Sequence, residues 1–398
     1  MTAQAGNSKF VKTMNRQNIL NLIRLSEEIS RSELVQQTGL TAPTVSDITK
    51  RFMHKGLIVE SGIAKSTGGR RAVTFRLNPE ARYSVGLDVE NGHVGVQILD
   101  FTGETVFQAD FSYQGEVDFS ELLGLLENAV LHAIRESGIE REKVLGIGVS
   151  VPGLVNMDTG EVHLIPHFHL RNVPLKEKLE DVLQLPVSVI NDANAAALAE
   201  KWLGQARDNE NFICVVGRTG IGAGLFLGGE LYQGSAGVAG EIGHQTVEID
   251  GPLCDCGNYG CLESLAGSQA ILKYVKAQLK QGRKSMLTEL VEDFEALTLD
   301  NVCHAASLGD QLALDVFNRT GVYLGLGLAN IINILNPEKL LISGDILKYR
   351  DYLDRMHETL DSKLLGVQKR CCQVAYSEMG VNSSGRGAGV LVLDRFRV

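Results

Sequence analysis

One histidine and three cysteines are the residues of this chain whose types and spacing point most directly to chemistry. They stand in a glycine-rich segment at His244, Cys254, Cys256 and Cys261. One imidazole and three thiolates make a tetrahedral Zn²⁺ set with no open position, which predicts a structural zinc ion rather than a catalytic one. The ion would also hold the neighbouring carboxylates of Glu241 and Glu263 in place. The alternative is a loop of three unliganded cysteines.

An amide beside a carboxylate forms a second candidate site, at Asn191 and Asp192. The residues before the pair end a predicted strand, and the alanines after it begin a predicted helix. An amide donates and accepts hydrogen bonds and a carboxylate accepts them, so the two side chains suit a polyol such as a sugar. The alternative is that Asp192 is a helix N-cap with no ligand role.

Two segments of the chain contain the same types of predicted elements in the same order. Residues 83–113 read as three strands joined by turns, followed by a helix at 119–137 and a strand at 144–151. Residues 211–250 again begin with strand, glycine-rich turn and strand, and another strand follows at 339–345. The repeat predicts an α/β body of two similar lobes around a cleft, where ligands bind near strand ends and glycine turns.

The first eighty residues have a different pattern, typical of a winged helix-turn-helix. Apolar spacing predicts a first helix within 13–26, Ser30 or Ser32 can cap a second that ends at Gly39, and Thr41 can cap a third. Strands at 57–60 and 72–77 then flank a basic, glycine-containing turn, as in a hairpin wing. We therefore place this domain at 13–80, after a mobile segment at 1–12.

The third helix and the wing are the predicted DNA-reading surfaces. The helix would enter the major groove, and the wing arginines would contact phosphates or the minor groove. The candidate DNA contacts are Thr41, Thr44, Ser46, Thr49, Lys50, Arg70 and Arg71. The alternative is a small helical domain for protein contacts.

Charge is divided unevenly along the chain of 398 residues. Residues 1–80 carry 12 Lys and Arg against 6 Asp and Glu, a net charge of +6, and the remainder carries 26 against 42, a net charge of −16. A basic head on an acidic body indicates that only the head meets phosphates. The chain has no apolar run long enough to span a bilayer and no signal-peptide core at its start, so we expect a cytoplasmic protein without membrane insertion.

The metal motif, the Asn-Asp pair and the duplicated body together resemble the ROK family, whose name joins repressors, open reading frames and kinases. The resemblance covers almost the whole chain. It implies an actin-like, hexokinase-like ATPase fold over 81–398, with lobes at about 81–195 and 196–398. With its winged helix, the chain resembles the family's sugar repressors, such as those for xylose and N-acetylglucosamine.

The resemblance also implies sugar-binding residues. Asp192 matches the base of the family's kinases, Asn191 matches a residue that hydrogen-bonds the sugar, and Gly153 lies in a segment that resembles the substrate loop. His167 stands where relatives often have Asn, which leaves the identity of the ligand open. The full set of sugar-binding candidates is Gly153, His167, Asn191, Asp192, Glu241, His244 and Glu263.

The nucleotide motifs depart from those of the family's kinases. The kinases carry Asp-x-Gly-Gly-Thr after the first strand, whereas here Asp88 is followed by Glu90 and Asn91 at the glycine positions. A carboxylate there would repel a triphosphate, and side chains would block close approach of the backbone. Residues 218–224 still resemble the second phosphate loop, but 343–345 match the adenosine contact weakly. We therefore predict a body without enzymatic activity, in which Asp192 is a vestigial base.

These observations predict a sugar-responsive repressor of carbohydrate-metabolism genes. Its partners would be operator DNA, a small sugar effector and a second copy of the chain, with a tetramer as the alternative assembly. Two other functions stay open: a regulator that retains sugar kinase activity, and a repressor controlled by a transporter protein.

Overall fold

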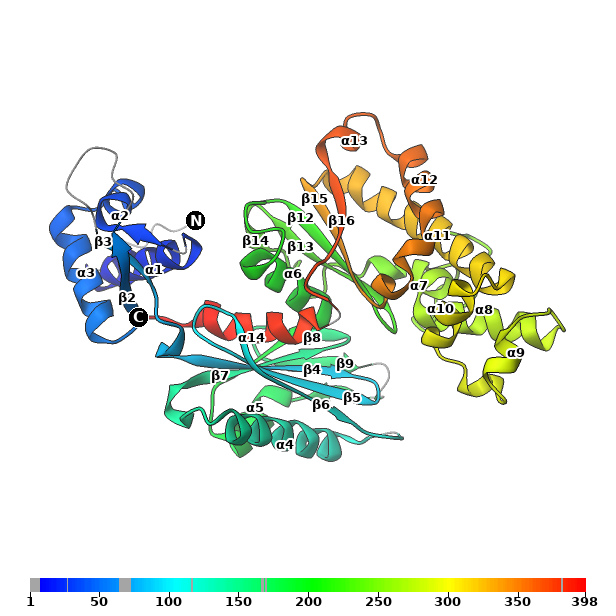
Figure 1. Cartoon of the computed structure of the whole chain (residues 1–398), viewed down its shortest axis with the longest axis horizontal. Coiled ribbons are helices and arrows are strands. Elements are labelled where there is room, and N and C mark those ends of the chain that lie inside the picture. Colours follow the sequence, from blue (N-terminus) through cyan, green and yellow to red (C-terminus); the bar gives the residue numbers. More distant parts are fainter. Residues whose placement is uncertain are drawn as a thin grey trace.

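The chain folds into an N-terminal winged helix and an α/β body with two five-stranded sheets (Figure 1). The computed structural model describes residues 8–26, 28–63, 73–115, 117–165, 168, 170–380 and 382–398. None of the helices within these ranges has the length and apolar character that crossing a bilayer requires.

The N-terminal domain has the three helices and the two hairpin strands that the sequence predicts, together with a short third strand that it does not predict. Its elements are α1 (Ser8–Leu25), β1 (Ile29–Ser30), α2 (Arg31–Thr38), α3 (Ala42–His54), β2 (Ile58–Ile63) and β3 (Val73–Leu77), with strand order β1-β3-β2. α1 begins at Ser8, so the first helix starts earlier than the predicted domain boundary at residue 13. Residues 1–7 and most of the predicted wing turn, 64–72, lie outside the described residues.

Capping residues fix the turn between α2 and α3. The hydroxyl of Ser30 accepts a hydrogen bond from the backbone N–H of Glu33 at 3.2 Å, and the Glu33 carboxylate accepts one from the N–H of Ser30 at 2.7 Å. Gly39 ends α2 with a φ of 66°, which glycine adopts without strain. Thr41 caps α3. These local interactions confirm the predicted helix boundaries.

A five-stranded sheet with the order β11-β7-β4-β5-β6 forms the first lobe of the body. Its strands are β4 (Tyr83–Glu90), β5 (His93–Leu99), β6 (Thr105–Ser112), β7 (Val144–Val151) and β11 (Val187–Asn191). The helices α4 (Phe119–Ser137) and α5 (Leu175–Leu183) belong to this lobe, as does a short sheet of β8 (Leu154–Asn156), β9 (Glu161–Ile165) and β10 (Leu170–Val173). The helix predicted at 119–137 is confirmed by α4.

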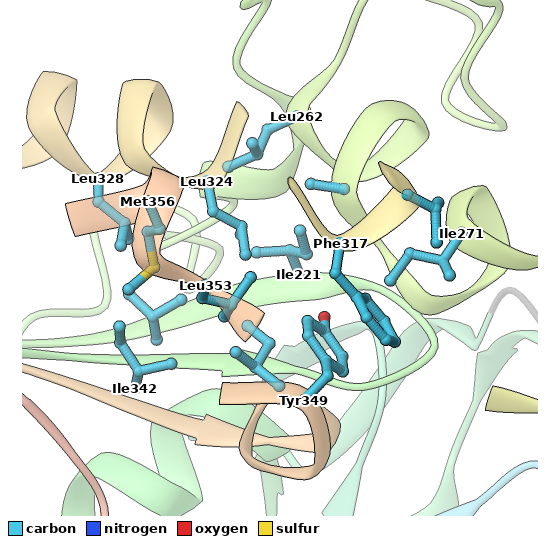
Figure 2. Packing of buried hydrophobic residues seen from close by; sticks show 14 of the residues in the cluster. Ile221, Leu262, Ile271, Phe317, Leu324, Leu328, Ile342, Tyr349, Leu353 and Met356 are labelled. Atoms are coloured by element: carbon cyan, nitrogen blue, oxygen red, sulfur yellow. The ribbon is translucent and has the colours of Figure 1, made fainter. Parts of the chain in front are cut away.

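The second lobe has a five-stranded sheet with the order β14-β13-β12-β15-β16. Its strands are β12 (Phe212–Gly217), β13 (Ile221–Leu227), β14 (Glu230–Leu231), β15 (Lys339–Gly344) and β16 (Gln373–Tyr376). Its helices are α7 (Leu262–Ala266), α8 (Ser268–Lys280), α9 (Leu287–Leu290), α10 (Leu299–Ser307), α11 (Gln311–Leu335), α12 (Asp354–Lys363) and α13 (Gln368–Cys371). Figure 2 shows its core, where Phe317 of α11 stacks on Tyr349 with 4.8 Å between ring centroids.

The two sheets repeat one pairing pattern. β4 pairs antiparallel with β5 and parallel with β7, and β12 pairs antiparallel with β13 and parallel with β15. The repeat confirms the predicted duplication.

Two helices, α6 (Asp192–Leu203) and α14 (Ser383–Arg395), pack against each other where the lobes meet. α6 packs on β12 and β13 of the second sheet, and α14 packs on β4 and β7 of the first. The expected division, which gave all of 196–398 to the second lobe, is therefore wrong for the end of the chain. Small residues explain the return of α14, because a Cβ on Gly148 of β7 would lie only 1.8 Å from the carbonyl oxygen of Ala388.

Candidate functional site

A pocket of about 520 Å³ lies between the two lobes, at the ends of β4, β11 and β12. This volume is within the range of roughly 300–1,000 Å³ that is typical of small-molecule sites. Six of the residues predicted to bind sugar line it: Gly153, Asn191, Asp192, Glu241, His244 and Glu263. The seventh, His167, lies outside the described residues.

The turn from β11 to α6 orients the Asn-Asp pair. Asn191 is the N-cap of α6, because its side-chain oxygen accepts hydrogen bonds from the N–H groups of Ala193 at 3.0 Å and Asn194 at 3.2 Å. Its amide nitrogen donates to the carbonyl of Gly153 at 3.0 Å, which ties the turn to the loop after β7. Asp192 is therefore not the N-cap, although one of its oxygens accepts from the Ala193 N–H at 2.9 Å.

The Asp192 carboxylate lies among other charges in the pocket. Burial raises the pKa of Asp192 to about 6, the nearby Arg218 opposes this rise, and the charge of Asp88 adds to it. A carboxylate that is costly to keep desolvated gains from a ligand that donates hydrogen bonds to it. The side chain is thus suited to a hydroxyl group.

Two more carboxylates reach the pocket from the second lobe. Glu263 on α7 accepts a hydrogen bond from the N–H of Ile221 at 3.0 Å, so it braces the glycine-rich turn that begins β13. Oε2 of Glu241 lies 3.8 Å from Nε2 of His244, and burial raises the pKa of the Glu241 carboxyl. Both groups present oxygen acceptors to the same cavity.

The predicted metal ligands converge. The ligand atoms of His244, Cys254, Cys256 and Cys261 all lie within 4.8 Å of one another. Nδ1 of His244 is 3.7 Å from Sγ of Cys254, and the sulfur atoms of Cys256 and Cys261 are also 3.7 Å apart. Ligands on a tetrahedral ion with Zn–S bonds of about 2.3 Å are about 3.8 Å apart, so the arrangement fits such an ion. With Nδ1 on this side, Nε2 of His244 faces Glu241 and the pocket.

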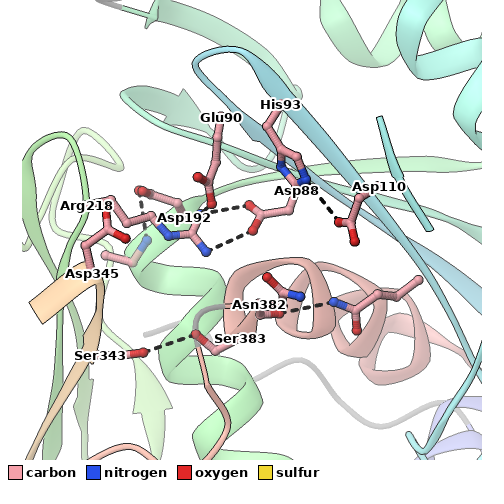
Figure 3. A network of polar contacts seen from close by, with 12 residues as sticks. Asp88, Glu90, His93, Asp110, Asp192, Arg218, Ser343, Asp345, Asn382 and Ser383 are labelled. Carbon is pink, nitrogen blue, oxygen red and sulfur yellow. Dashed lines mark hydrogen bonds and ion pairs between the residues drawn. The ribbon is translucent and has the colours of Figure 1, made fainter. Parts of the chain in front are cut away.

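A buried arginine crosses the cleft on its other side (Figure 3). Arg218, just after β12, donates to both carboxylate oxygens of Asp88, at 3.1 and 2.9 Å, and pairs with Glu90 at 2.7 Å. Burial alone would lower the pKa of Arg218, but Asp88 and Glu90 hold it above its usual value. The sequence predicts only a loop that resembles a phosphate-binding loop here. Arg218 is the single basic residue within 217–224, and this is the signal from which the ion pair could have been predicted.

Arg171 of β10 and Asp255 of the cysteine segment also line the pocket. Sequence reasoning did not select either residue. Both lie next to motifs that it did use, and nothing in their spacing marks them.

The candidate DNA contacts divide by burial. Thr41 and Lys50 are exposed on α3, and Thr44 and Ser46 are half-buried. Thr49 is fully buried, and its hydroxyl donates to the carbonyl of Val45 at 2.9 Å, so the prediction that it lies on the outer face is wrong. Arg51 is also exposed, lies next to Lys50 and pairs with Asp47 at 3.0 Å, but it is not among the predicted DNA contacts.

Arg70 and Arg71 lie outside the described residues, so their placement in a wing stays a prediction.

Comparison with known families identifies the chain. Residues 85–395 match the ROK family, and residues 15–59 match a winged helix-turn-helix DNA-binding family. The protein belongs to the ROK family and combines its actin-like, hexokinase-like fold with a winged helix-turn-helix. Both assignments confirm the predicted family and fold class.

Particular relatives span almost the full length of the chain. The xylose repressor of Bacillus subtilis is 32% identical over 389 residues, 97% of each chain. The DNA-binding transcriptional dual regulator NagC of Escherichia coli is 32% identical over 395 residues, 98% of this chain and 95% of that one.

Solved structures show the same division into domains. A ROK family transcriptional regulator, described as a homologue of the E. coli MLC protein, has a TM-score of 0.82 at 30% identity and covers 96% of this chain and 97% of its own. A ROK family glucokinase from Streptomyces griseus, in complex with glucose and AMPPNP, has a TM-score of 0.70 at 27% identity. It covers 78% of this chain and 98% of its own.

Proposed function

We propose that this protein is a repressor of carbohydrate-metabolism genes whose affinity for operator DNA changes when a sugar binds in the cleft. One observation carries the proposal: the pocket keeps hydroxyl-binding groups around Asp192, while Arg218 occupies its nucleotide side. The winged helix and the relatives named as repressors support the DNA-binding half of the proposal. Relatives named for xylose and N-acetylglucosamine support a sugar as the effector.

In this proposal, the sugar is held by hydrogen bonds from both lobes. Asp192 and Glu241 accept from hydroxyl groups, and Nε2 of His244 donates to a ring or hydroxyl oxygen. Asn191 and Gly153 shape the turn against which the sugar lies, and Glu263 supports the opposite wall. Binding across the cleft favours one angle between the lobes, because ligand contacts on both sides stabilise the closed arrangement.

The metal proposed for the cysteine segment is zinc, with a structural role. His244, Cys254, Cys256 and Cys261 would hold it as a closed tetrahedral set. When bound, it fixes the loop that carries Glu241 and the start of α7, which carries Glu263. The His244 ring then keeps one nitrogen for the pocket.

The proposal includes the absence of kinase activity. A triphosphate on the nucleotide side would have to displace Glu90 from Arg218, and the charge of Asp88 lies next to it. Both carboxylates would repel the phosphates, and Arg218, the cation that could attract them, is already paired with both. Asp192 thus has no phosphoryl donor to act on and serves as a hydrogen-bond acceptor.

The DNA contacts proposed on α3 are Thr41, Thr44, Ser46 and Lys50, with Arg70 and Arg71 on the wing. A winged helix reads one half-site, so we propose a homodimer on a symmetric operator, with a tetramer as the alternative. Sugar binding would change the spacing of the paired winged helices relative to the two half-sites.

The test uses the full-length protein and a DNA duplex that it selects from a random library. The duplex affinity is measured by fluorescence anisotropy with xylose, glucose, N-acetylglucosamine and their phosphates, and the melting temperature is recorded with each. We expect at least one sugar to raise the melting temperature and to change the duplex affinity by fivefold or more.

The other outcomes separate the alternative functions. Unchanged DNA affinity across the whole panel contradicts a sugar effector and favours control by a transporter protein. Consumption of ATP with hexoses or pentoses contradicts a non-enzymatic body and favours a regulator that is also a kinase.

A further inference from the structure

Helix α6 runs from the pocket to the winged helix. Its first residue, Asp192, lines the pocket, and Trp202 in its last turn contacts α1 of the DNA-binding domain. Ten residues of α-helix separate these two positions by about 15 Å at a rise of 1.5 Å per residue. The helix contains no glycine or proline between them, so displacement of one end moves the other.

Close packing holds α6 against both lobes. On the β13 side, a Cβ on Gly224 would lie 2.4 Å from the Cβ of Ala197, and on the α14 side a Cβ on Gly387 would lie 1.7 Å from the carbonyl oxygen of Ala195. α6 is therefore in close contact with an element of each lobe. A change in the angle between the lobes has to displace α6 relative to one of them, because packed interfaces shift between discrete arrangements rather than deform continuously.

The far end of α6 meets α1 through a stacked pair. The guanidinium carbon of Arg24 lies 3.3 Å from the centroid of the Trp202 ring, within the range of a cation–π contact. Burial lowers the pKa of Arg24 to about 10, which shows how closely the body covers it. Around this pair, α1 meets the body through Leu20, Phe101 and Phe396.

We propose that Trp202 is a positioning residue that sets the orientation of the winged helix through Arg24, so that sugar binding at one end of α6 changes DNA affinity at the other. This inference rests on the proposed function and deepens it by naming the contact through which the pocket regulates the DNA-binding domain. The contact lies beside the segment that joins the two domains, where the N–H of Phe101 donates to the carbonyl of Pro79 at 3.0 Å. A small shift of the Trp202 ring therefore acts close to the pivot of the winged helix.

The experiment compares full-length Trp202→Leu with wild type, using the selected duplex and xylose, glucose and N-acetylglucosamine in turn. Sugar affinity is measured by calorimetry and duplex affinity by anisotropy. We expect Trp202→Leu to bind the sugar with the affinity of wild type. The change in duplex affinity that the sugar causes should be at least fivefold smaller in this variant than in wild type. Trp202→Phe, which keeps an aromatic face, restores most of the response.

Two further variants keep the test decisive. Arg24→Gln removes the cation without opening the core, so it gives the same loss of response even if Trp202→Leu fails to fold. Tyr274→Leu is the matched control, because Arg319 lies over the Tyr274 ring at 5.1 Å in the second lobe, and this variant should respond as wild type does.

The possible failures are distinguishable. If wild type does not respond to any sugar or sugar phosphate of the full panel, the proposed function fails and this inference fails with it. If wild type responds and both Trp202→Leu and Arg24→Gln respond equally, only the inference is overturned. Because Trp202 is the only tryptophan of the chain, its fluorescence gives a direct check: a sugar that changes DNA affinity without changing this emission also overturns it.

Discussion

The carboxylates on the two sides of the cleft differ in the groups that contact them. On the side proposed for the nucleotide, Asp88 and Glu90 are both paired with Arg218 from the other lobe. On the sugar side, Asp192 and Glu241 line the cavity, and burial raises the pKa of both. The carboxylates on one side of the pocket therefore have an arginine of the protein as their partner. Those on the other side are free to accept hydrogen bonds from a ligand with hydroxyl groups.

In the proposed function, this difference accounts for a cleft that binds a sugar and not a nucleotide. The salt bridge joins β4 to the turn after β12, on the side that the proposal assigns to the nucleotide. The carboxylates proposed to accept from a sugar need no such partner within the protein. A hydroxyl group of the ligand that donates a hydrogen bond to a buried carboxylate stabilises its charged form.

The largest effect is expected from loss of the metal that the proposal places beside the sugar-binding groups. Structural zinc contributes about 10–16 kcal/mol in zinc-finger peptides, so Cys261→Ser should release the metal and disorder the 244–263 segment. We expect sugar binding to become undetectable by calorimetry and the zinc content to fall from one ion per chain to none. Cys303→Ser, at a free cysteine outside the cluster, should change neither. Full sugar affinity in Cys261→Ser would contradict a supporting role for the metal.

The second prediction breaks the nucleotide side. Arg218→Leu leaves the buried Asp88 without its partner, so the free energy of unfolding should fall by about 3–5 kcal/mol, measured by urea denaturation. Arg135→Leu is the control, because its pair with Glu136 is exposed to solvent and contributes little to stability. Asp88→Asn added to Arg218→Leu should recover much of the loss. A loss no larger than that of the control would show that the bridge is not a stabilising element.

The parts that the sequence predicts well depend on neighbours along the chain. The Ser30–Glu33 capping box and the helix end at Gly39 follow from rules that act over a few residues, and the metal ligands all lie within 244–261. Thr49 shows the limit of such rules. The buried face of α3 includes both Ile48 and Thr49, and the burial of a short polar residue depends on what packs against the helix.

The parts that it does not predict depend on residues far apart in the chain. Arg218 and Asp88 are 130 positions apart, and only the closing of two lobes brings them together. The return of α14 to the first sheet is equally non-local, since its Gly387 fits against α6 and its Ala388 against Gly148 of β7 only after both elements are in place. The duplication could be predicted because the same order of strands and turns recurs, whereas the contacts between the two copies leave no such pattern.

The third prediction compares single carboxylates on the two sides. Asp192→Asn replaces a charged hydrogen-bond acceptor, which contributes about 1.5–3 kcal/mol, so sugar affinity should fall roughly 10- to 100-fold by calorimetry. Glu90→Gln on the nucleotide side should change sugar affinity less than about threefold, because Glu90 bonds to Arg218 rather than to the sugar. Equal losses in the two variants would remove the distinction between the two sides.

The smallest effect concerns pH. Burial raises the pKa of Asp192 to about 6, with Arg218 opposing the rise and Asp88 and Glu241 adding to it. A sugar hydroxyl that donates to the carboxylate favours its charged form, so the pKa is lower in the complex. Sugar affinity should therefore be constant above about pH 7 and fall as the pH drops through 6, by about tenfold between pH 7.5 and 5.

Stability should change in the opposite direction. The pKa of Asp192 in the folded state lies above its unfolded value of 3.8, so the folded state binds the extra proton between these values. The stability that this proton contributes is fully present below the unfolded pKa and is lost as the pH rises through about 6. Asp192→Asn should abolish both trends, since an amide does not titrate. If the fall in affinity persists in that variant, another group is responsible, and the sugar side would not depend on the charge of Asp192.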